Sequence, residues 1–443
     1  CKKWGVFMNW KEVYKQKICT AKEAVSHIHS GDRVVVAHAC AEPVVLTDAM
    51  TEAAEKYDWK EIEVVHMVAM GKAGYCAPEM EKHFRHNALF VGGTTRQAVE
   101  EGRADFTPVF FSEVPDLLRK DMHVDVALLQ VSAPDEHGYC SLGVSCDYTK
   151  AAAECAAIRI AQVNEKMPRA MGDNFIHVSE LDYIVPVNTD LIELQPPKIG
   201  EVQKKIGEHI ASLVKDGDCL QLGIGAIPDA VLMFLKNKKN LGIHSEMFSD
   251  GVVDLINAGV ITNKCKQIDK GQCVATFLMG TKKLYDFVDN NPMVQMKPVD
   301  IVNDPRVICQ NDNVVSINSC VEVDLMGQVC SESVGLKQIS GVGGQVDFVR
   351  GANMSKGGRT IMAMPATAAK GTISKIVPLL AEGAAVTTSR CDVDYVVTEY
   401  GIAKLHGCTL KERARQLIHI AAPAFRESLK QEYENRFRCK LED

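Results

Sequence analysis

The fold is decided by the stretch D216-G-D-C-L-Q-L-G-I-G-A-I-P-D-A-V-L232, which holds a Gly-Asp pair, an apolar run, a small-residue turn and a proline suited to a first helical turn. The first half of the chain repeats this arrangement as S30-G-D-R-V-V-V-A-H-A-C-A-E-P-V-V-L46. The strands that follow also correspond, V64-V-H-M-V68 against G242-I-H-S-E246. We therefore expect two related domains, each built from strand, turn and helix units.

Runs rich in Val, Ile and Leu alternate with longer helical patterns along the chain, which is typical of an α/β protein with a mostly parallel sheet covered on both faces. The clearest runs are R33-V-V-V-A37, I62-E-V-V-H-M-V68, D125-V-A-L-L-Q-V-S132, C219-L-Q-L222, A384-A-V-T-T388 and D394-Y-V-V-T398. The proline-containing stretch 183–200 is predicted to connect the halves, and an amphipathic helix is predicted over 201–214. We expect domains at 8–190 and 191–443.

The composition excludes several classes of protein. The 443 residues include 50 Lys+Arg and 57 Asp+Glu, and no basic block is present, which argues against a nucleic-acid binder. No apolar run is long enough to span a bilayer, and the first residues do not form a credible secretory signal. The sixteen cysteines include no C-x-x-C pair and the thirteen histidines are scattered, so we expect reduced thiols in the cytoplasm and no metal site.

The repeat breaks at one place, and the break singles out Glu246. Aligning His66 with His244 puts Val68 opposite Glu246, and it puts A37-H-A-C-A41 opposite the more open L222-G-I-G-A226. The ordinary interpretation of Glu246 is a solvated loop carboxylate. A carboxylate beside a glycine turn in only one half instead predicts a functional site.

Three further features could take part in chemistry. The turn before Pro228 lets a ligand approach the backbone at the start of a helix, where N–H groups favour an anion. The glycine-rich stretch S340-G-V-G-G-Q-V-D-F-V-R350 is either a flexible turn or a loop whose N–H groups face an oxyanion. Lys370 follows a strand end, and it is either solvated or a partner for phosphate or carboxylate.

These residues resemble the acetyl-CoA hydrolase/transferase family from about Met8 to the C-terminus. The resemblance rests on several long motifs in order: F-F-S-E-V-P (Phe110 to Pro115), V131-S-A-P-D-E-H-G138, Q221-L-G-I-G-A-I-P-D-A230, H244-S-E-M-F-S-D-G251, G341-V-G-G-Q-V-D-F348 and V393-D-Y-V-V-T-E-Y-G401. One departure is A-A-P at 421–423, where the family pattern has A-H-P. The family implies two similar open, mostly parallel α/β/α domains with the active site between them.

The resemblance also assigns roles to residues. It implies that Glu246 carries CoA as a thioester and that Gly344 belongs to the oxyanion loop. The implied CoA-binding residues are Gly223, Ile224, Gly225, Ala226, Ile227, Gly343 and Lys370, with a looser match at Lys370 because the preceding loop varies in length. No permanently bound cofactor is implied, because CoA is both substrate and covalent adduct. A homo-oligomer, with a homodimer as its simplest form, is also expected.

The expected function is therefore transfer of CoA from an acyl-CoA, acetyl-CoA being the expected donor, to a short-chain carboxylate such as 4-hydroxybutyrate. A thioester is already activated, so a carboxylate can attack it without a redox centre or a metal. A thioester hydrolase on the same scaffold is the closest alternative. The acid about 20 residues after G-x-G also leaves an NAD-dependent dehydrogenase open, although Pro228 occupies the third small-residue position. A non-catalytic CoA-binding regulator, which would not need Glu246, is the remaining alternative.

Overall fold

The computed structural model describes residues 9–441, which form two compact units. The first unit contains the chain up to Thr107, together with Val114–Glu193 and Tyr285–Pro298. The second unit contains Pro108–Glu113, Leu194–Leu284 and the chain from Val299 onward. Each unit therefore takes a short segment from the other half of the sequence.

The first unit is built around a seven-stranded sheet in which neighbouring strands are parallel, in the order β4-β3-β2-β1-β5-β7-β9. The strands are β1 (Arg33–Val36), β2 (Ile62–His66), β3 (Phe84–Ala88), β4 (Ala104–Phe106), β5 (Val126–Ser132), β7 (Ile158–Asn164) and β9 (Tyr183–Val187). Every residue of β5 is buried, as expected for a strand covered on both faces.

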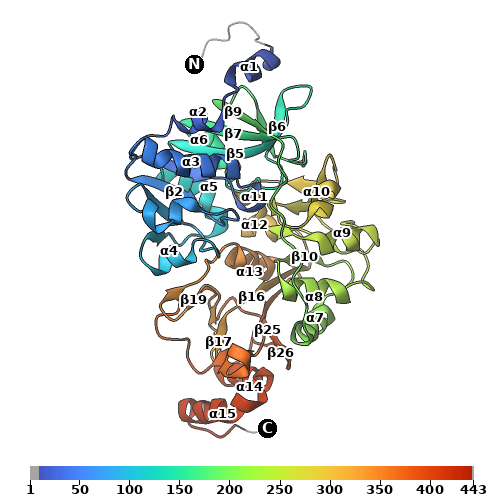
Figure 1. The fold of residues 1–443 in the computed structure, drawn as a ribbon. Coiled ribbons are helices and arrows are strands. Elements are labelled where there is room, and N and C mark those ends of the chain that lie inside the picture. The colour runs from blue at the N-terminus through green and yellow to red at the C-terminus, as the bar shows by residue number, and fades with distance from the viewer. Residues whose placement is uncertain (1–8, 442–443) are drawn as a thin grey trace. The chain divides into compact units, whose positions relative to one another are not determined.

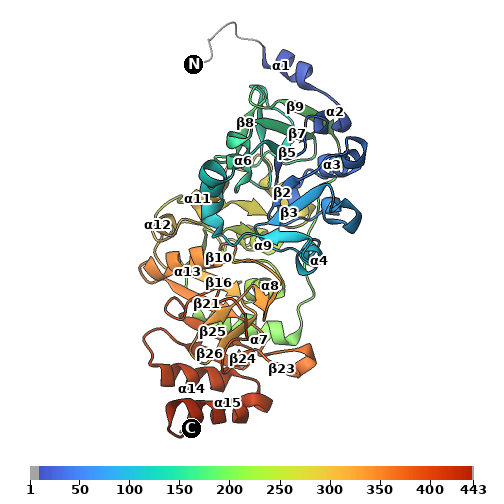
Figure 2. The same cartoon turned by 90° about the vertical axis from the view of Figure 1, so that its left-hand side faces the viewer.

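Helices cover both faces of this sheet. Figure 2 shows α3 (Val44–Lys56) and α6 (Thr149–Cys155) on opposite sides of it. Leu46 and Met50 of α3 pack into the same core as Val34 and Val64 of the sheet. Smaller elements complete the unit: α1 (Trp10–Lys17), α2 (Ala21–Val25), α4 (Arg96–Glu100), α5 (Val114–Asp116), and the hairpin of β6 (Tyr139–Ser141) with β8 (Phe175–His177).

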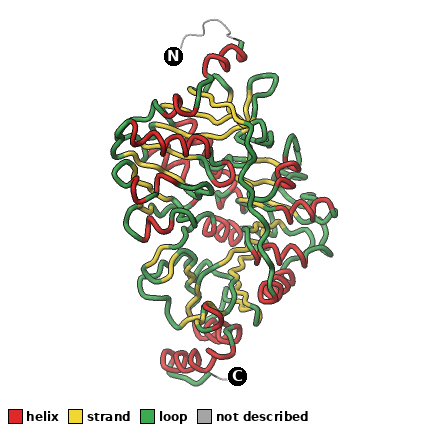
Figure 3. The backbone as a smooth tube through the Cα atoms, in the orientation of Figure 1, coloured by secondary structure: helices red, strands yellow, loops and turns green. Residues whose placement is uncertain are grey.

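The second unit has an eight-stranded, mostly parallel sheet in the order β14-β12-β10-β16-β21-β25-β26, with β11 paired to β10. The strands are β10 (Cys219–Leu222), β11 (Gly242–Ile243), β12 (Met247–Phe248), β14 (Phe277–Leu278), β16 (Val314–Ser319), β21 (Arg359–Ala363), β25 (Tyr395–Thr398) and β26 (Gly401–Lys404). The antiparallel pairs are β10 with β12 and β25 with β26. The strands and helices of both units are distinguished in Figure 3.

The helices of the second unit likewise lie on both sides of its sheet (Figures 1 and 2). The helices are α7 (Glu201–Leu213), α8 (Ala226–Phe234), α9 (Asp250–Asn257), α11 (Val299–Val302), α12 (Pro305–Ile308), α13 (Gln345–Met354), α14 (Leu410–Ile420) and α15 (Pro423–Phe437). Figure 2 shows α13 on the side opposite to α7 and α8. The apolar face of α14, including Leu417 and Ile418, is buried in the core of this unit. Intramolecular packing therefore accounts for that face.

The repeat predicted from the sequence is present in the topology. In the first unit β1 lies between β2 and β5, and in the second unit β10 lies between β11 and β16, with parallel pairing in each case. The small-residue turns both follow the central strand and lead into a helix, α3 or α8. The α/β class and the mostly parallel sheets are confirmed.

Two expectations about elements were wrong. The stretch 183–200 is not connector throughout, because Tyr183–Val187 forms β9 at the edge of the first sheet, where Pro186 is tolerated. Residues 384–388 do not form a strand, and only Thr388 makes an isolated bridge, to Val329. Val386 in that segment is half exposed, so the apolar run does not enter the core.

Within residues 9–441, no helix is both long and apolar enough to cross a membrane. The cysteines in this range, from Cys19 to Cys439, are free thiols.

Candidate active site

Glu246 lies in the short gap between β11, which ends at Ile243, and β12, which begins at Met247. Its backbone carbonyl accepts hydrogen bonds from the N–H groups of Thr276 at 2.9 Å and Phe277 at 3.2 Å. These two bonds fix the Glu246 backbone against the neighbouring strand β14. The side chain is only partly buried, so this carboxylate can meet a ligand.

The two residues before Glu246 fix the structure around it. Buried His244 donates its Nε2–H to the Val302 carbonyl at 2.8 Å, at the end of α11. Buried Ser245 donates to the Leu222 carbonyl at 3.0 Å and accepts from the Leu222 N–H at 3.2 Å. The H-S-E motif therefore connects the glutamate to α11 on one side and to the end of β10 on the other.

Asn303 holds the carboxylate of Glu246. Its side-chain Nδ2 donates to Glu246 Oε2 at 2.8 Å, and Asn303 itself is completely buried. Asn303 directly follows α11, and its N–H bonds the Val299 carbonyl at 2.9 Å. The backbone of Asn303 is therefore fixed at the end of α11, and its side-chain amide orients the Glu246 carboxylate from there.

The predicted oxyanion loop lies against this carboxylate. Gly343 has φ +53°, a left-handed conformation, and Gly344 is the N-cap of α13. A Cβ atom built on Gly344 would overlap Glu246 Oε2 and Asn303 Nδ2, and it would lie 3.0 Å from Glu246 Cδ. Among the described residues, neither the Gly343 nor the Gly344 N–H donates a hydrogen bond. The structure thus brings Glu246, Gly343 and Gly344 together at a helix N-terminus.

The predicted CoA-binding turn, Gly223 to Ile227, joins β10 to α8. Gly225 is the N-cap of α8 and has φ +109°, which a side chain rarely adopts, and a Cβ built there would meet no atom within 4 Å. Ala226 and Ile227 open the helix, where the first N–H groups have no acceptor within the helix itself. Because Gly223 directly follows Leu222, the Ser245 hydrogen bonds connect this turn to Glu246.

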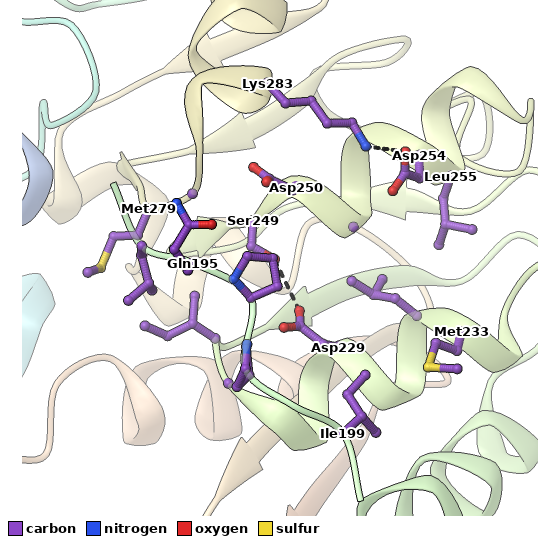
Figure 4. Close-up of a pocket in the computed structure, with 18 of the residues that line it drawn as sticks. Gln195, Ile199, Asp229, Met233, Ser249, Asp250, Asp254, Leu255, Met279 and Lys283 are labelled. Carbon is purple, nitrogen blue, oxygen red and sulfur yellow. Dashed lines mark hydrogen bonds and ion pairs between the residues drawn. The ribbon is translucent and has the colours of Figure 1, made fainter. Parts of the chain in front are cut away.

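A cavity of about 590 Å³ in the second unit borders this turn, with Ile224 and Gly225 in its lining. Figure 4 shows this cavity, with Asp229, Ser249 and Met279 among its labelled lining residues. Its apolar lining includes Pro196, Leu232, Met233, Leu255 and Met279. Its polar groups include Asp229, whose pKa is raised by burial and which accepts a hydrogen bond from Ser249 Oγ at 3.3 Å. Lys283 is paired with Asp254. The volume of this cavity is in the range of small-molecule binding sites.

Lys370 is the predicted site residue that the structure does not connect to the others. It lies in a short turn between β22 (Thr367–Ala368) and β23 (Ile373–Ser374), with φ +56° and an exposed side chain. Among the described residues it makes no hydrogen bond or ion pair with Glu246 or either glycine loop.

Sequence reasoning missed Asn303, Ser112 and Asp347. Buried Asp347 is in the first turn of α13 and accepts two hydrogen bonds from Ser112. Burial raises the pKa of Asp347 to about 6, against the lowering effects of hydrogen bonds from Ser112 and Asn303. Ser112 and Asp347 were inside motifs that carried the family resemblance, but Asn303 lies in V-N-D-P, which signals only the start of α12.

Taken together, the second unit offers a partly exposed carboxylate, amide donors beside it and a glycine turn that a ligand can approach. A carboxylate of this kind can act as a nucleophile, and N–H groups at a helix N-terminus can stabilise a developing oxyanion. These are the groups that an acyl-transfer site requires.

Comparison with known proteins gives the family. The N-terminal domain model of acetyl-CoA hydrolase/transferase matches residues 6–194, and the C-terminal domain model matches residues 280–433. The chain is 66% identical to 4-hydroxybutyrate coenzyme A transferase of Clostridium kluyveri, over 97% of this chain and 100% of that protein. The chain belongs to the acetyl-CoA hydrolase/transferase family.

Solved structures agree with this result. The chain resembles a 4-hydroxybutyrate CoA-transferase from Porphyromonas gingivalis, with 47% identity, a TM-score of 0.84 and coverage of 97% of this chain and 100% of that chain. It also resembles RipA from Yersinia pestis, with 39% identity, a TM-score of 0.93 and coverage of 98% and 100%. The prediction of a CoA-transferase is confirmed, and the alternative of an NAD-dependent dehydrogenase is set aside.

Proposed function

We propose that this CoA-transferase moves CoA from acetyl-CoA to a short-chain carboxylate, with 4-hydroxybutyrate as the preferred acid, through a thioester between CoA and Glu246. The observation that carries the proposal is the position of the Glu246 carboxylate, held by Asn303 and packed directly against Gly344 at the start of α13. The choice of acid follows the name of the Clostridium kluyveri relative at 66% identity.

The first half-reaction uses the carboxylate as a nucleophile. A Glu246 oxygen attacks the acyl carbon of acetyl-CoA, the C–S bond breaks, and a mixed anhydride and CoA thiolate form. The thiolate then attacks Glu246 Cδ, which breaks the anhydride, releases acetate and leaves CoA on the enzyme. No proton is consumed overall.

The second half-reaction runs these steps in reverse. The incoming carboxylate attacks the glutamyl thioester, CoA thiolate leaves, and a new mixed anhydride forms. The thiolate attacks the acyl carbon of the new acid, which releases the product acyl-CoA and restores the carboxylate. Each tetrahedral intermediate carries an oxyanion, for which the Gly343 and Gly344 N–H groups are the proposed donors; loss of one such donor costs about 3 kcal/mol.

We assign CoA binding to the turn Gly223–Ile227 and to Lys370. Gly225 leaves open space over the backbone, so the pantetheine part of CoA can approach it closely. The first N–H groups of α8 favour an anionic group of the ligand. Exposed Lys370 is available for a phosphate of CoA.

Steady-state kinetics test the function. With acetyl-CoA and 4-hydroxybutyrate varied together, a covalent carrier gives parallel lines in double-reciprocal plots, whereas direct transfer in a ternary complex gives intersecting lines. A panel of acids, including acetate and butyrate, identifies the preferred acceptor. CoA release from acetyl-CoA without any acid measures hydrolysis, and hydrolysis faster than transfer would favour the hydrolase alternative.

The remaining expectations are part of the same proposal. We propose domains at 8–190 and 191–443, a cytoplasmic location, which fits the free thiols, and a homodimer. Light scattering of the purified protein tests the oligomeric state.

A further inference from the structure

A segment from the first half of the chain belongs to the second unit and contacts the loop beside Glu246. This segment, Pro108–Glu113, contains the F-F-S-E part of a motif that has no role in the reaction described above. Its Phe111 N–H donates to the Gly343 carbonyl at 3.0 Å. The Phe111 ring lies edge-on to Phe277, with centroids 6.1 Å apart, and Phe277 donates its N–H to the Glu246 carbonyl. The segment therefore supports both the glycine loop and the glutamate backbone.

Ser112 in this segment fixes Asp347. Its N–H donates to Asp347 Oδ2 at 3.0 Å, and its Oγ donates to Asp347 Oδ1 at 2.8 Å. Both carboxylate oxygens are therefore held by one residue, and Asp347 is only 4% exposed. Among the described residues Asp347 forms no ion pair. Burial of a carboxylate without a cation is costly, so its hydrogen bonds must be well made.

The start of α13 connects Asp347 to Glu246. Asp347 lies three residues after Gly344, the N-cap of α13, and a Cβ atom built on Gly344 would overlap Glu246 Oε2 and Asn303 Nδ2. The buried Asn303 amide donates to the same Glu246 oxygen at 2.8 Å, so the position of this helix start decides where the Glu246 carboxylate can lie.

We propose that Asp347, anchored by Ser112, is a positioning residue that holds the first turn of α13, and with it Gly344, against the Glu246 carboxylate and so orients that carboxylate for attack. The inference rests on the proposed covalent role of Glu246 and adds two residues that do not touch the substrate. It explains why the segment 108–113 and the first turn of α13 are tied together at this point. Asp347→Asn would replace one acceptor oxygen with a donor, so one of the two Ser112 donors would lose its acceptor.

The test is the rate at which CoA becomes attached to Glu246 after mixing with acetyl-CoA, followed by rapid quenching and mass spectrometry. We expect Asp347→Asn to slow this step about 10- to 100-fold, as for a misplaced reacting group. Ser112→Ala keeps the backbone donor and should slow it roughly tenfold. Ser112→Thr keeps the hydroxyl and should restore a rate close to that of the unchanged protein. KM for acetyl-CoA should stay the same in all three.

Ser355→Ala is the matched control. Ser355 lies at the other end of α13, where its Oγ donates to the Asn311 carbonyl at 2.7 Å and accepts from the Val314 N–H at 3.2 Å. The variant therefore loses two buried hydrogen bonds at the end of the same helix. It should lower the melting temperature without slowing attachment of CoA. A slowing by Ser112→Ala no greater than that by Ser355→Ala would overturn the proposal. So would an Asp347→Asn variant that attaches CoA at the normal rate.

The outcomes separate this inference from the proposed function. If CoA is attached at equal rates in the unchanged protein, in Asp347→Asn and in Ser112→Ala, the proposed function stands and the positioning role is removed. Transfer by the unchanged protein without any attached CoA removes the covalent function itself, and the positioning role with it.

Discussion

At the scale of single residues, the site depends on the absence of a side chain at Gly344. The carboxylate of Glu246 and the amide of Asn303 both occupy the space in which any Cβ atom at this position would lie. Because φ of Gly344 is −94°, the backbone itself would accept another residue. Glycine is therefore needed at position 344 so that Glu246 and Asn303 can lie close to the backbone, and not because of the backbone conformation.

Gly344→Ala should fold, because its backbone is unstrained, and should displace the Glu246 side chain. We expect kcat for CoA transfer to fall about 100-fold, as for a reacting group moved by about 1 Å. Because the turn Gly223–Ile227 is untouched, KM for acetyl-CoA should change little. A normal kcat in this variant would show that transfer does not require the contact of the Glu246 carboxylate with the start of α13.

Asp347 predicts a pH dependence of stability. Its pKa is raised from 3.8 in the unfolded chain to about 6 in the folded protein, chiefly by burial. The folded state therefore holds the proton more tightly, so this stabilising contribution is fully present below about pH 4 and is lost as pH rises through about 6. A pKa change of this size corresponds to about 3 kcal/mol.

The comparison of the unchanged protein with Asp347→Asn isolates this effect, since other groups that titrate in the same range are shared. We expect the difference in unfolding free energy, measured by denaturant titration, to shift by about 2 kcal/mol in favour of Asp347→Asn between pH 4 and pH 6, where most of the full change is lost. A difference that does not depend on pH would show that Asp347 titrates normally.

At the scale of elements, the turn between β10 and α8 has the same place in its unit as the turn between β1 and α3. The first-unit turn is filled by buried His38, Cys40 and Glu42, whereas Gly225 has open space around it. The same element thus closes one sheet edge and leaves the other accessible to a ligand.

Gly225→Val should weaken binding of acyl-CoA by placing a branched side chain in that space. A loss of about 1.4 kcal/mol would raise KM about tenfold. Gly271→Val is the matched control, because Gly271 also has positive φ (+82°) and open space but lies outside the turn. Both variants should lose stability, and only Gly225→Val should raise KM. If the two folded variants had the same KM for acyl-CoA, the turn Gly223–Ile227 would not be the CoA-binding site.

Much of this organisation follows from sequence pattern. Apolar runs between helices predict the parallel sheets, and the break in the repeat predicts Glu246, since both are local signals. Asn303 was not predictable in the same way. It is far from Glu246 along the chain and contacts it only because His244 fixes the end of α11 next to the glutamate. The strand expected over 384–388 failed because an apolar run does not reveal whether a partner strand is available.

At the scale of the whole molecule, the two units share a fold, yet only the second has the glutamate and the glycine loops. The short segments that each unit takes from the other half of the sequence include 108–113, whose residues contact the loop beside Glu246. The first half of the chain thus contributes directly to the site built by the second. Family membership agrees with both halves, since one domain model matches each of them.

The central claim is that Glu246 carries CoA between the two half-reactions. The most direct measurement is mass spectrometry of the protein after incubation with acetyl-CoA alone, with the modified peptide located by digestion. We predict CoA attached to the peptide that contains Glu246, its loss when 4-hydroxybutyrate is added, and its absence in Glu246→Gln, which should lose at least about a thousandfold in transfer. Steady transfer with no attached CoA, or near-normal transfer by Glu246→Gln, would contradict the account.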